Sequence, residues 1–325
     1  MKKYILPIII TLFTLFIAAK YIPLEQLSRI PKQITLKGLL IGVILYLISY
    51  VIVALRWRVL FAEGLGGKIE ASPFLLLLMS GAHQFYGNFL PARTGDLTIL
   101  YLAKKHLKIE TALSMSSLII ARALDFLALG ILGLFFIIWQ RRNIRSLNAG
   151  HWIFTFCLIG IPMLGILLSL LWGRQIAGGL EHLGAPQISG RAKPVPKRLV
   201  LFLARIVTIL SERKSGVFYM KCLGISFLLM LVRIGLFSAF AFYSHDAISP
   251  FAAPLIGLST LVVSTIPLQG FMGVGPFEGG WVLGYVLAGR PAERGLIMAM
   301  NAHLIIIILL VVLGSLSNFI LLRRR

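Results

Sequence analysis

Charged residues interrupt two strongly apolar parts of this 325-residue chain. The first interruption, residues 88–96, reads N-F-L-P-A-R-T-G-D and is followed by Arg122 and Asp125 inside the next apolar stretch. The second, residues 267–280, reads P-L-Q-G-F-M-G-V-G-P-F-E-G-G and carries Glu278. A charged side chain within a membrane span is costly and usually faces the protein interior or a wet cavity, so these residues are candidates for a functional site.

The chemistry open to these side chains is the recognition of an anionic headgroup. Arg122 and Asp125 are three positions apart, so on a helix they share a face and can pair. Either they form a neutral structural ion pair, or Arg122 binds a lipid phosphate through its planar guanidinium while Asp125 orients it. Arg93 and Asp96 could clamp a substrate. Glu278 is either a titrating carboxylate, or a helix cap or arginine partner.

Arg233 and two histidines are further polar candidates. Arg233 has no charge partner nearby in its own helix, so we expect it to pair with Glu278 or with an anionic headgroup. His83 and His303 could bind a metal or move protons, although a lone histidine in a helix bundle is more typically a hydrogen-bonded packing residue. The sequence contains no recognisable metal-ligand spacing or Ser-His-Asp arrangement. We therefore expect no metal, no cofactor and no enzymatic activity.

Each interruption also contains residues that break helices. Pro91 removes a backbone donor and pushes the preceding residue out of the helical region, while Gly95 permits backbone angles that other residues avoid. In lipid, such a break survives only where it is buried in protein or lines a wet cavity. We therefore expect broken or re-entrant helices; the alternative for the first is an ordinary polar loop. The predicted breaking residues are Asn88, Pro91, Gly95, Pro267, Gly273 and Gly275.

The composition is that of a membrane protein. Hydrophobic residues make up 58% of the chain and charged residues 13%, compared with about 25% charged residues in soluble domains. The net charge of +21 comes from cations in short loops between apolar spans. This distribution favours contact with anionic lipid headgroups and argues against a nucleic-acid partner. Cys157 and Cys222 both lie in apolar segments, so no disulfide framework is expected.

The apolar pattern predicts an all-α polytopic membrane protein with about six to eight transmembrane helices. An interface anchor, R-W-R, follows the second span at 56–58, and an amphipathic helix on the membrane surface is predicted at 197–214. The expected spans are 4–19, 36–55, 112–139, 152–172, 217–243 and 296–322, with an apolar segment at 73–89 that need not cross completely, a short helix at 99–107 and an apolar lead-in at 250–267.

The two interruptions follow the same plan, which predicts an internal repeat within one domain spanning 1–325. The halves are 73–139 and 250–322, separated by a cytoplasmic loop at 173–216 that holds the amphipathic helix. Each half has a proline, a glycine, a carboxylate and a long closing span with a polar residue near its start. The distribution of Lys and Arg predicts cytoplasmic termini if both broken elements are re-entrant and open to opposite sides.

The ordered set N-F-L-P-A-R-T-G-D, A-R-A-L-D at 121–125 and P-x(5)-G-x-G-x-x-E at 267–278 resembles the lysylphosphatidylglycerol synthase transmembrane family of flippase-like proteins. Larger members join this domain to a soluble aminoacyl transferase, and the membrane domain is understood to translocate the modified lipid. These 325 residues include no such transferase, so the resemblance implies a stand-alone flippase rather than a synthase. It points to Arg93, Asp96, Arg122, Asp125 and Glu278, while His303 in place of an arginine weakens the equivalence of the halves.

Three functions follow as hypotheses. The first is a flippase of the bacterial cytoplasmic (inner) membrane that moves a polar or anionic lipid, whether aminoacylated, hopanoid or polyprenyl-linked, with membrane lipids and a lipid-modifying enzyme as partners. The second is a membrane-embedded enzyme or accessory subunit of a lipid-modifying glycosyltransferase, with Asp96 and Glu278 as acid and base. The third is a purely structural membrane partner. The lipid, the energy coupling and the oligomeric state are not encoded in any pattern that we recognise.

Overall fold

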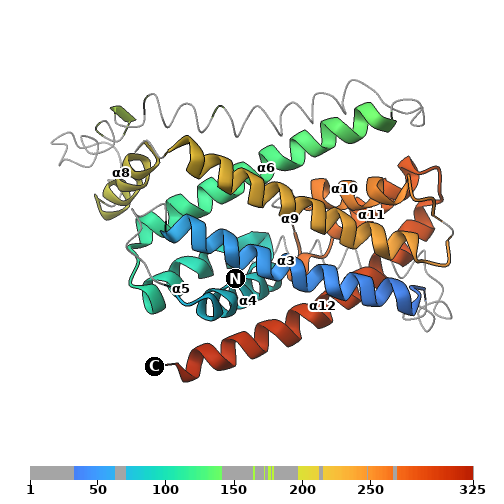
Figure 1. Cartoon of the computed structure of the whole chain (residues 1–325), viewed down its shortest axis with the longest axis horizontal. Helices are drawn as coiled ribbons and strands as arrows, with labels where there is room; N and C mark the ends of the chain where they lie inside the picture. Colours follow the sequence, from blue (N-terminus) through green and yellow to red (C-terminus); the bar gives the residue numbers. More distant parts are fainter. Residues whose placement is uncertain are drawn as a thin grey trace, which may run out of the picture.

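The computed structural model describes residues 33–62, 71–140, 164, 172, 175, 176, 178, 197–211, 215–246, 248–265 and 269–324. Four long helices run through the bundle: α3 (Leu36–Ala62), α6 (Thr111–Gln140), α9 (Gly216–Phe242) and α12 (Ala292–Arg323) (Figure 1). Each is long and apolar enough to cross a membrane. This confirms the corresponding four predicted spans and the all-α polytopic fold; the predicted span at 4–19 and nearly all of that at 152–172 lie outside the described residues.

Two broken helical hairpins fill the space between the long helices. The first consists of α4 (Pro73–Phe89), the 3-10 helix η4 (Pro91–Leu97) and α5 (Thr98–Leu107). The second consists of α10 (Ala253–Val263), the 3-10 turn η5 (Phe271–Gly273) and α11 (Pro276–Leu287). Each hairpin follows a 27-residue helix, α3 or α9, and precedes the longest helix of its half, α6 or α12. The described residues therefore show the same element order twice.

The hairpins enter the bundle from opposite ends. At the start of α4, Phe74 lies beneath the guanidinium of Arg324, and the end of α5 packs in one cluster with Phe61 and Leu321. At the end of α11, the Tyr285 hydroxyl donates to Asp246 just beyond α9. The start of α10 packs there too, because Ala253 shares a cluster with the last turns of α9. Each hairpin thus begins and ends at one end of the bundle, and the two tips meet in its interior.

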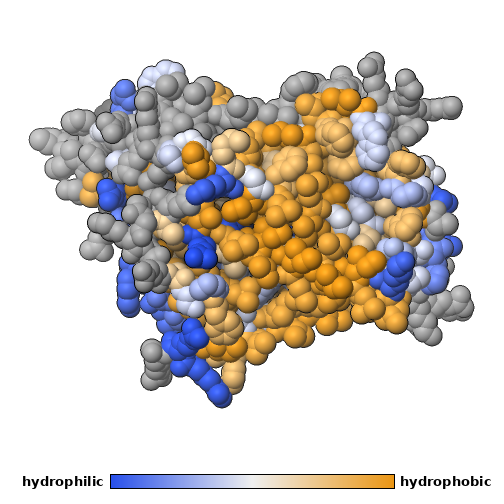
Figure 2. Space-filling model, in the orientation of Figure 1, coloured by the Kyte–Doolittle hydropathy of each residue, from blue (hydrophilic) through white to orange (hydrophobic). Residues whose placement is uncertain are grey.

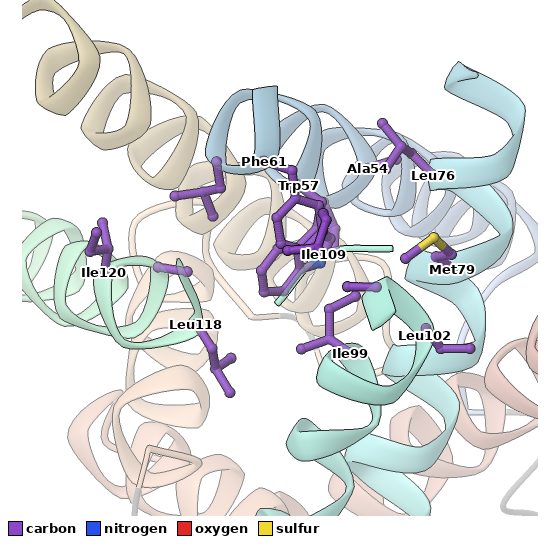
Figure 3. Close-up of a cluster of buried hydrophobic side chains, with 14 of the residues drawn as sticks. Ala54, Trp57, Phe61, Leu76, Met79, Ile99, Leu102, Ile109, Leu118 and Ile120 are labelled. Atoms are coloured by element: carbon purple, nitrogen blue, oxygen red, sulfur yellow. The ribbon is translucent and has the colours of Figure 1, made fainter. Parts of the chain in front are cut away.

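The first hairpin is held by a large apolar cluster (Figure 3). Trp57 of α3 stacks on Phe61 at 5.3 Å between ring centroids and is fully buried among side chains of α4, α5 and α6. Ile99 and Leu102 on one face of α5 close the cluster from below α3 (Figure 3). Burying a side chain of this size contributes about 1.5–3 kcal/mol, so the cluster fixes the short hairpin helices against the long ones.

The second hairpin is held by close backbone contact. A Cβ added at Gly280 of α11 would lie 2.5 Å from the Cα of Thr260 in α10, and one at Gly284 would lie 2.6 Å from the Cα of Ile256. The Ser259 hydroxyl donates across the same contact to the Gly280 carbonyl, at 2.9 Å. Glycines four residues apart let two helices approach in this way, as small residues do at many helix contacts in membranes.

The amphipathic helix α8 (Lys197–Ser211) packs on the start of α6. Ile206 and Ile209 are buried against Ala112, and Arg205 forms an exposed ion pair with Glu110 at 3.5 Å. Leu201 and Leu203 remain exposed. The predicted amphipathic helix is therefore present, and its apolar face contacts the protein as well as presenting side chains outward.

The exterior has the pattern expected of a membrane protein. Figure 2 shows a broad apolar surface across the middle of the bundle, with hydrophilic side chains gathered toward its two ends. Exposed apolar side chains recur along each long helix, among them Leu47 of α3 and Leu316 of α12. α12, at 32 residues, would span about 48 Å, so it must tilt or project beyond a hydrocarbon layer of about 30 Å.

Gly81 offers a test of this packing. A Cβ at Gly81 would lie 1.7 Å from the Tyr50 hydroxyl and 2.3 Å from that of Ser317, two groups that bond each other at 2.8 Å. Gly81→Ala should lower the free energy of unfolding by about 1–3 kcal/mol through overpacking. Thermal unfolding in detergent micelles measures it, with Gly224→Ala as the control because nothing lies within 4 Å of a Cβ there. Equal midpoints for the two variants would contradict this packing.

Candidate functional site

The tips of the two hairpins meet at a cavity of about 200 Å³. The Gln269 amide donates to the Gly87 carbonyl at 3.5 Å, which joins the second tip directly to the first. Both hairpins and all four long helices contribute to its walls. The polar and charged lining residues are Tyr46, Ser49, Arg56, His83, Gln84, Asn88, Asp96, Arg122, Asp125, Arg233, Ser264, Thr265, Gln269 and His303.

The first tip has the predicted break with a different role for its glycine. Leu90 is extended (φ −82°, ψ 139°) and Pro91 opens η4, as the sequence indicated. Gly95 does not have a positive φ, which corrects the expectation that it adopts unusual backbone angles. A glycine is needed at this position because the backbone of α4 lies too close for a side chain: a Cβ on residue 95 would overlap the Tyr86 carbonyl oxygen. Arg93 lies within η4, and its side chain is outside the described residues.

The second tip depends on left-handed backbone angles. Met272 (φ 58°), Gly273 (φ 83°) and Gly275 (φ 107°) have positive φ values in close succession, and Pro276 then opens α11. A non-glycine residue in this region is uncommon, so Met272 is held there by its surroundings. Gly273 and Gly275, two of the predicted breaking residues, lie at this break with backbone angles that favour glycine. Pro267 lies outside the described residues.

The most buried ion pair joins α3 to α6. One guanidinium nitrogen of Arg56 lies 2.7 Å from both carboxylate oxygens of Asp125, and each residue is 4% exposed. The sequence had placed Arg56 in an interface anchor, which is wrong: the side chain turns inward, against the Trp57 ring. The position of an arginine about two turns before the end of a long apolar helix does not by itself show whether the side chain faces the membrane interface or the protein interior. Its pairing with Asp125 depends on tertiary contact.

Arg122 pairs mainly with the first tip. Its guanidinium lies 2.5 Å from the Asp96 carboxylate and 3.8 Å from that of Asp125. The expected Arg122–Asp125 contact is therefore present but secondary, since Asp125 is held by Arg56. The Arg122 side chain is 28% exposed and lines the cavity. Asn88, the other polar residue predicted here, also lines the cavity and donates to the Gln84 carbonyl in its own helix at 2.8 Å.

Glu278 stabilises the second tip. One carboxylate oxygen accepts the Gly275 backbone N–H at 2.7 Å, which caps α11, and the other lies 2.5 Å from Nδ1 of His303 on α12. Nε2 of His303 lies 2.9 Å from the Met272 carbonyl oxygen. The structure thus shows Glu278 as a helix cap, one of the two roles considered for it, and of the two partners considered for Arg233 it does not show Glu278.

The two tips are tied to their closing helices in the same way. Asp96 and Arg122 are 26 positions apart, and Glu278 and His303 are 25 apart. In each half, a carboxylate at the start of the returning helix binds a polar side chain of the long helix that follows. This correspondence supports the predicted internal repeat and makes His303 the counterpart of Arg122.

Several polar atoms around the cavity have no partner in the part of the chain that the structure describes. They include the Gln84 amide nitrogen and Nδ1 of His83, both on α4. Buried polar groups almost always have a protein or water partner. These donors and acceptors therefore suit a cavity that holds water or a polar ligand. Gln84 was not predicted as a site residue, because the prediction relied on charged side chains within the apolar spans.

Arg233 of α9 lines the same cavity. Among the described residues, no carboxylate lies within ion-pair distance of its guanidinium, since the partners of Asp96, Asp125 and Glu278 are those given above. Within the described residues there is also no cluster of His, Cys, Asp and Glu that could hold a metal ion. The site is therefore a polar cavity in which one cation, Arg233, has no carboxylate partner among the described residues.

Comparison with known proteins identifies one family. The family model described as the lysylphosphatidylglycerol synthase TM region matches residues 4–314, nearly the whole chain. Neither the search of curated proteins nor that of solved structures gave a significant match.

The Arg56–Asp125 pair predicts a large stability effect. Asp125→Asn should lower the free energy of unfolding by about 3–5 kcal/mol, because it leaves the Arg56 charge buried without a counter-ion. Glu110→Gln removes the exposed pair with Arg205 and should cost at most about 1 kcal/mol. Denaturant unfolding in mixed micelles compares the two. If Asp125→Asn were no more destabilising than Glu110→Gln, the buried pair would not have the importance assigned to it.

Proposed function

The chain belongs to the lysylphosphatidylglycerol synthase TM region family, and we propose that it moves the headgroup of a polar or anionic lipid between the two leaflets of the bacterial inner membrane. The observation that carries this proposal is the meeting of two oppositely inserted hairpins at one polar cavity. A charge crossing hydrocarbon without such a cavity would meet a barrier of several kcal/mol or more. Broken helices whose tips meet near the middle of a membrane are a recurring design of transporters.

The proposed path lets the headgroup cross while the acyl chains stay in lipid. Both hairpins are re-entrant in this proposal, so each tip closes the cavity toward one side. Release of the Asp96–Arg122 contact would loosen the first tip, and release of the Glu278–His303 contact would loosen the second. The protein then needs two states, each with one tip engaged, and a lipid headgroup that binds in the cavity in both.

The arrangement of the carboxylates favours transport over the enzymatic alternative. Asp96 is held by Arg122, and Glu278 by His303 and the Gly275 N–H. A general acid and base pair must reach a common substrate. Glu278 caps a helix and is not among the residues that line the cavity, so the two carboxylates do not face one reacting centre.

Translocation can be tested in proteoliposomes that contain a headgroup-labelled anionic lipid. After the label in the outer leaflet is bleached, wild-type protein should speed the exchange of labelled lipid between the leaflets. Arg122→Gln and Glu278→Gln should each slow this exchange at least tenfold, because each variant frees one tip. Arg58→Gln, an exposed residue of α3 outside the cavity, is the matched control. Size-exclusion profiles confirm folding. No acceleration by folded wild-type protein with any labelled lipid would reject this function.

The charges at the two ends of the bundle are the basis for proposing which end faces the cytoplasm. Lys104, Lys105 and Lys108 gather at the end where α5 finishes, beside the C-terminal arginines of α12. Burial, with the charges of Lys105 and Lys108, lowers the pKa of His106, which favours its neutral form. At the opposite end, Asp246 and Glu293 offset the cations there. We propose that the α5 end, with the C-terminus, faces the cytoplasm; the excess of positive charge at this end among the described residues supports this orientation.

Cysteine labelling tests this orientation. In a background that lacks Cys157 and Cys222, Lys105→Cys should react with a membrane-impermeant maleimide only after the cells are opened. Arg294→Cys, at the other end, should react in intact cells because its side chain is exposed there. The reverse pattern would invert the assignment.

A further inference from the structure

We propose that Arg233 is the binding site for a singly charged phosphate or phosphodiester group in the central cavity. This inference rests on the proposed function, in which the cavity receives a lipid headgroup. It differs from the expectation drawn from the sequence, where Arg122 was the leading candidate to bind a phosphate.

The balance of charge around the cavity points to Arg233. Three arginines line it, and two of them are neutralised: Arg56 by Asp125 at 2.7 Å and Arg122 by Asp96 at 2.5 Å. The remaining carboxylate of the region, Glu278, is taken by His303 and the α11 cap. Among the described residues, one positive charge is therefore left without a counter-ion. Arg233 is partly buried at the wall of this cavity, where a charge is costly unless it is paired, so a monovalent anion is the partner that fits it.

The internal repeat explains why no described carboxylate pairs with Arg233. Arg56 and Arg233 occupy the corresponding helices α3 and α9, about one turn apart in register. If His303 matches Arg122, then the counterpart of Asp125 is Ile306, which also lines the cavity. The first half thus supplies a carboxylate for its arginine, and the second half has an isoleucine at that position. The two halves differ at the residue that would otherwise neutralise Arg233.

The surrounding groups suit phosphate better than carboxylate or a neutral headgroup. A guanidinium presents a planar set of donors that matches two phosphate oxygens. The Gln84 amide nitrogen, which lines the same cavity, is a further donor without a partner in the described part of the chain. The neutralised pairs on α6 keep Asp96 and Asp125 from repelling an incoming anion as free carboxylates would.

Ligand-dependent thermal stability of the full-length protein tests the site. In neutral detergent, phosphatidylglycerol should raise the unfolding midpoint of the wild-type protein by several degrees, and diacylglycerol with the same acyl chains should not. Arg233→Gln should lose the shift, Arg233→Lys should retain part of it, and Arg58→Gln should keep it in full. Inorganic phosphate forms a second arm: a shift with phosphate but none with phosphatidylglycerol would support the site and identify a free anion as its occupant.

A second variant keeps the test valid if Arg233→Gln does not fold. Ile306→Asp gives the second half the carboxylate that the first half has, and this internal counter-ion should remove the response to either anion. An unchanged midpoint shift in whichever of the two variants folds would overturn the proposal. So would a wild-type protein whose midpoint responds to neither anion.

The experiments can overturn the Arg233 site and the proposed lipid translocation independently of each other. If labelled lipid exchanges between leaflets equally in wild-type protein and Arg233→Gln, translocation stands and the Arg233 site is overturned. If the anion response depends on Arg233 but folded wild-type protein moves no lipid, the site stands and the proposed function falls.

Discussion

A charge cannot be left unpaired in a hydrocarbon layer, and the interior of this bundle is built around that constraint. Arg56 and Asp125 pin α3 to α6 because neither could remain ionised in the interior alone. The Asp96–Arg122 and Glu278–His303 contacts then tie each hairpin tip to its closing helix. These contacts fix where the tips lie, so they also define the cavity between them. Apolar clusters hold the helices together, whereas the ion pairs determine which side chains face inward.

The same constraint applies to the backbone. A helix that stops inside a membrane leaves donors and acceptors that lipid cannot satisfy. Here Glu278 satisfies the start of α11, and Gln269 reaches across to the carbonyl of Gly87 in the other hairpin. Nε2 of His303 on α12 likewise lies 2.9 Å from the Met272 carbonyl oxygen, so each tip also depends on a residue outside its own hairpin. This dependence explains how short broken helices persist between four long ones.

The sequence predicted the helices well and their side-chain partners less well. Long apolar runs located α3, α6, α9 and α12, and proline with glycine located both breaks, because these signals act over a few consecutive residues. The partners of Arg56 and Arg122 lie 69 and 26 positions away and depend on how helices pack, which no local pattern encodes. Arg122 and Asp125 share a helix face, which suggested a pair, yet stronger partners on other elements take both. The correspondence of His303 to Arg122 became clear only once both tips could be compared.

The contact between α10 and α11 has a mechanical consequence. With Gly280 and Gly284 against the backbone of α10, and Ser259 bonded across the seam, these two helices have no room to slide or separate without losing packing along their length. The hairpin of α10 and α11 is therefore rigid along its length. Any displacement of its tip must then arise by rotation of the whole hairpin, with bending confined to its outer ends, where Gly289 (φ 71°) has open space around it. A displacement at the outer end of this hairpin would therefore move both helices, and with them the tip, as one unit.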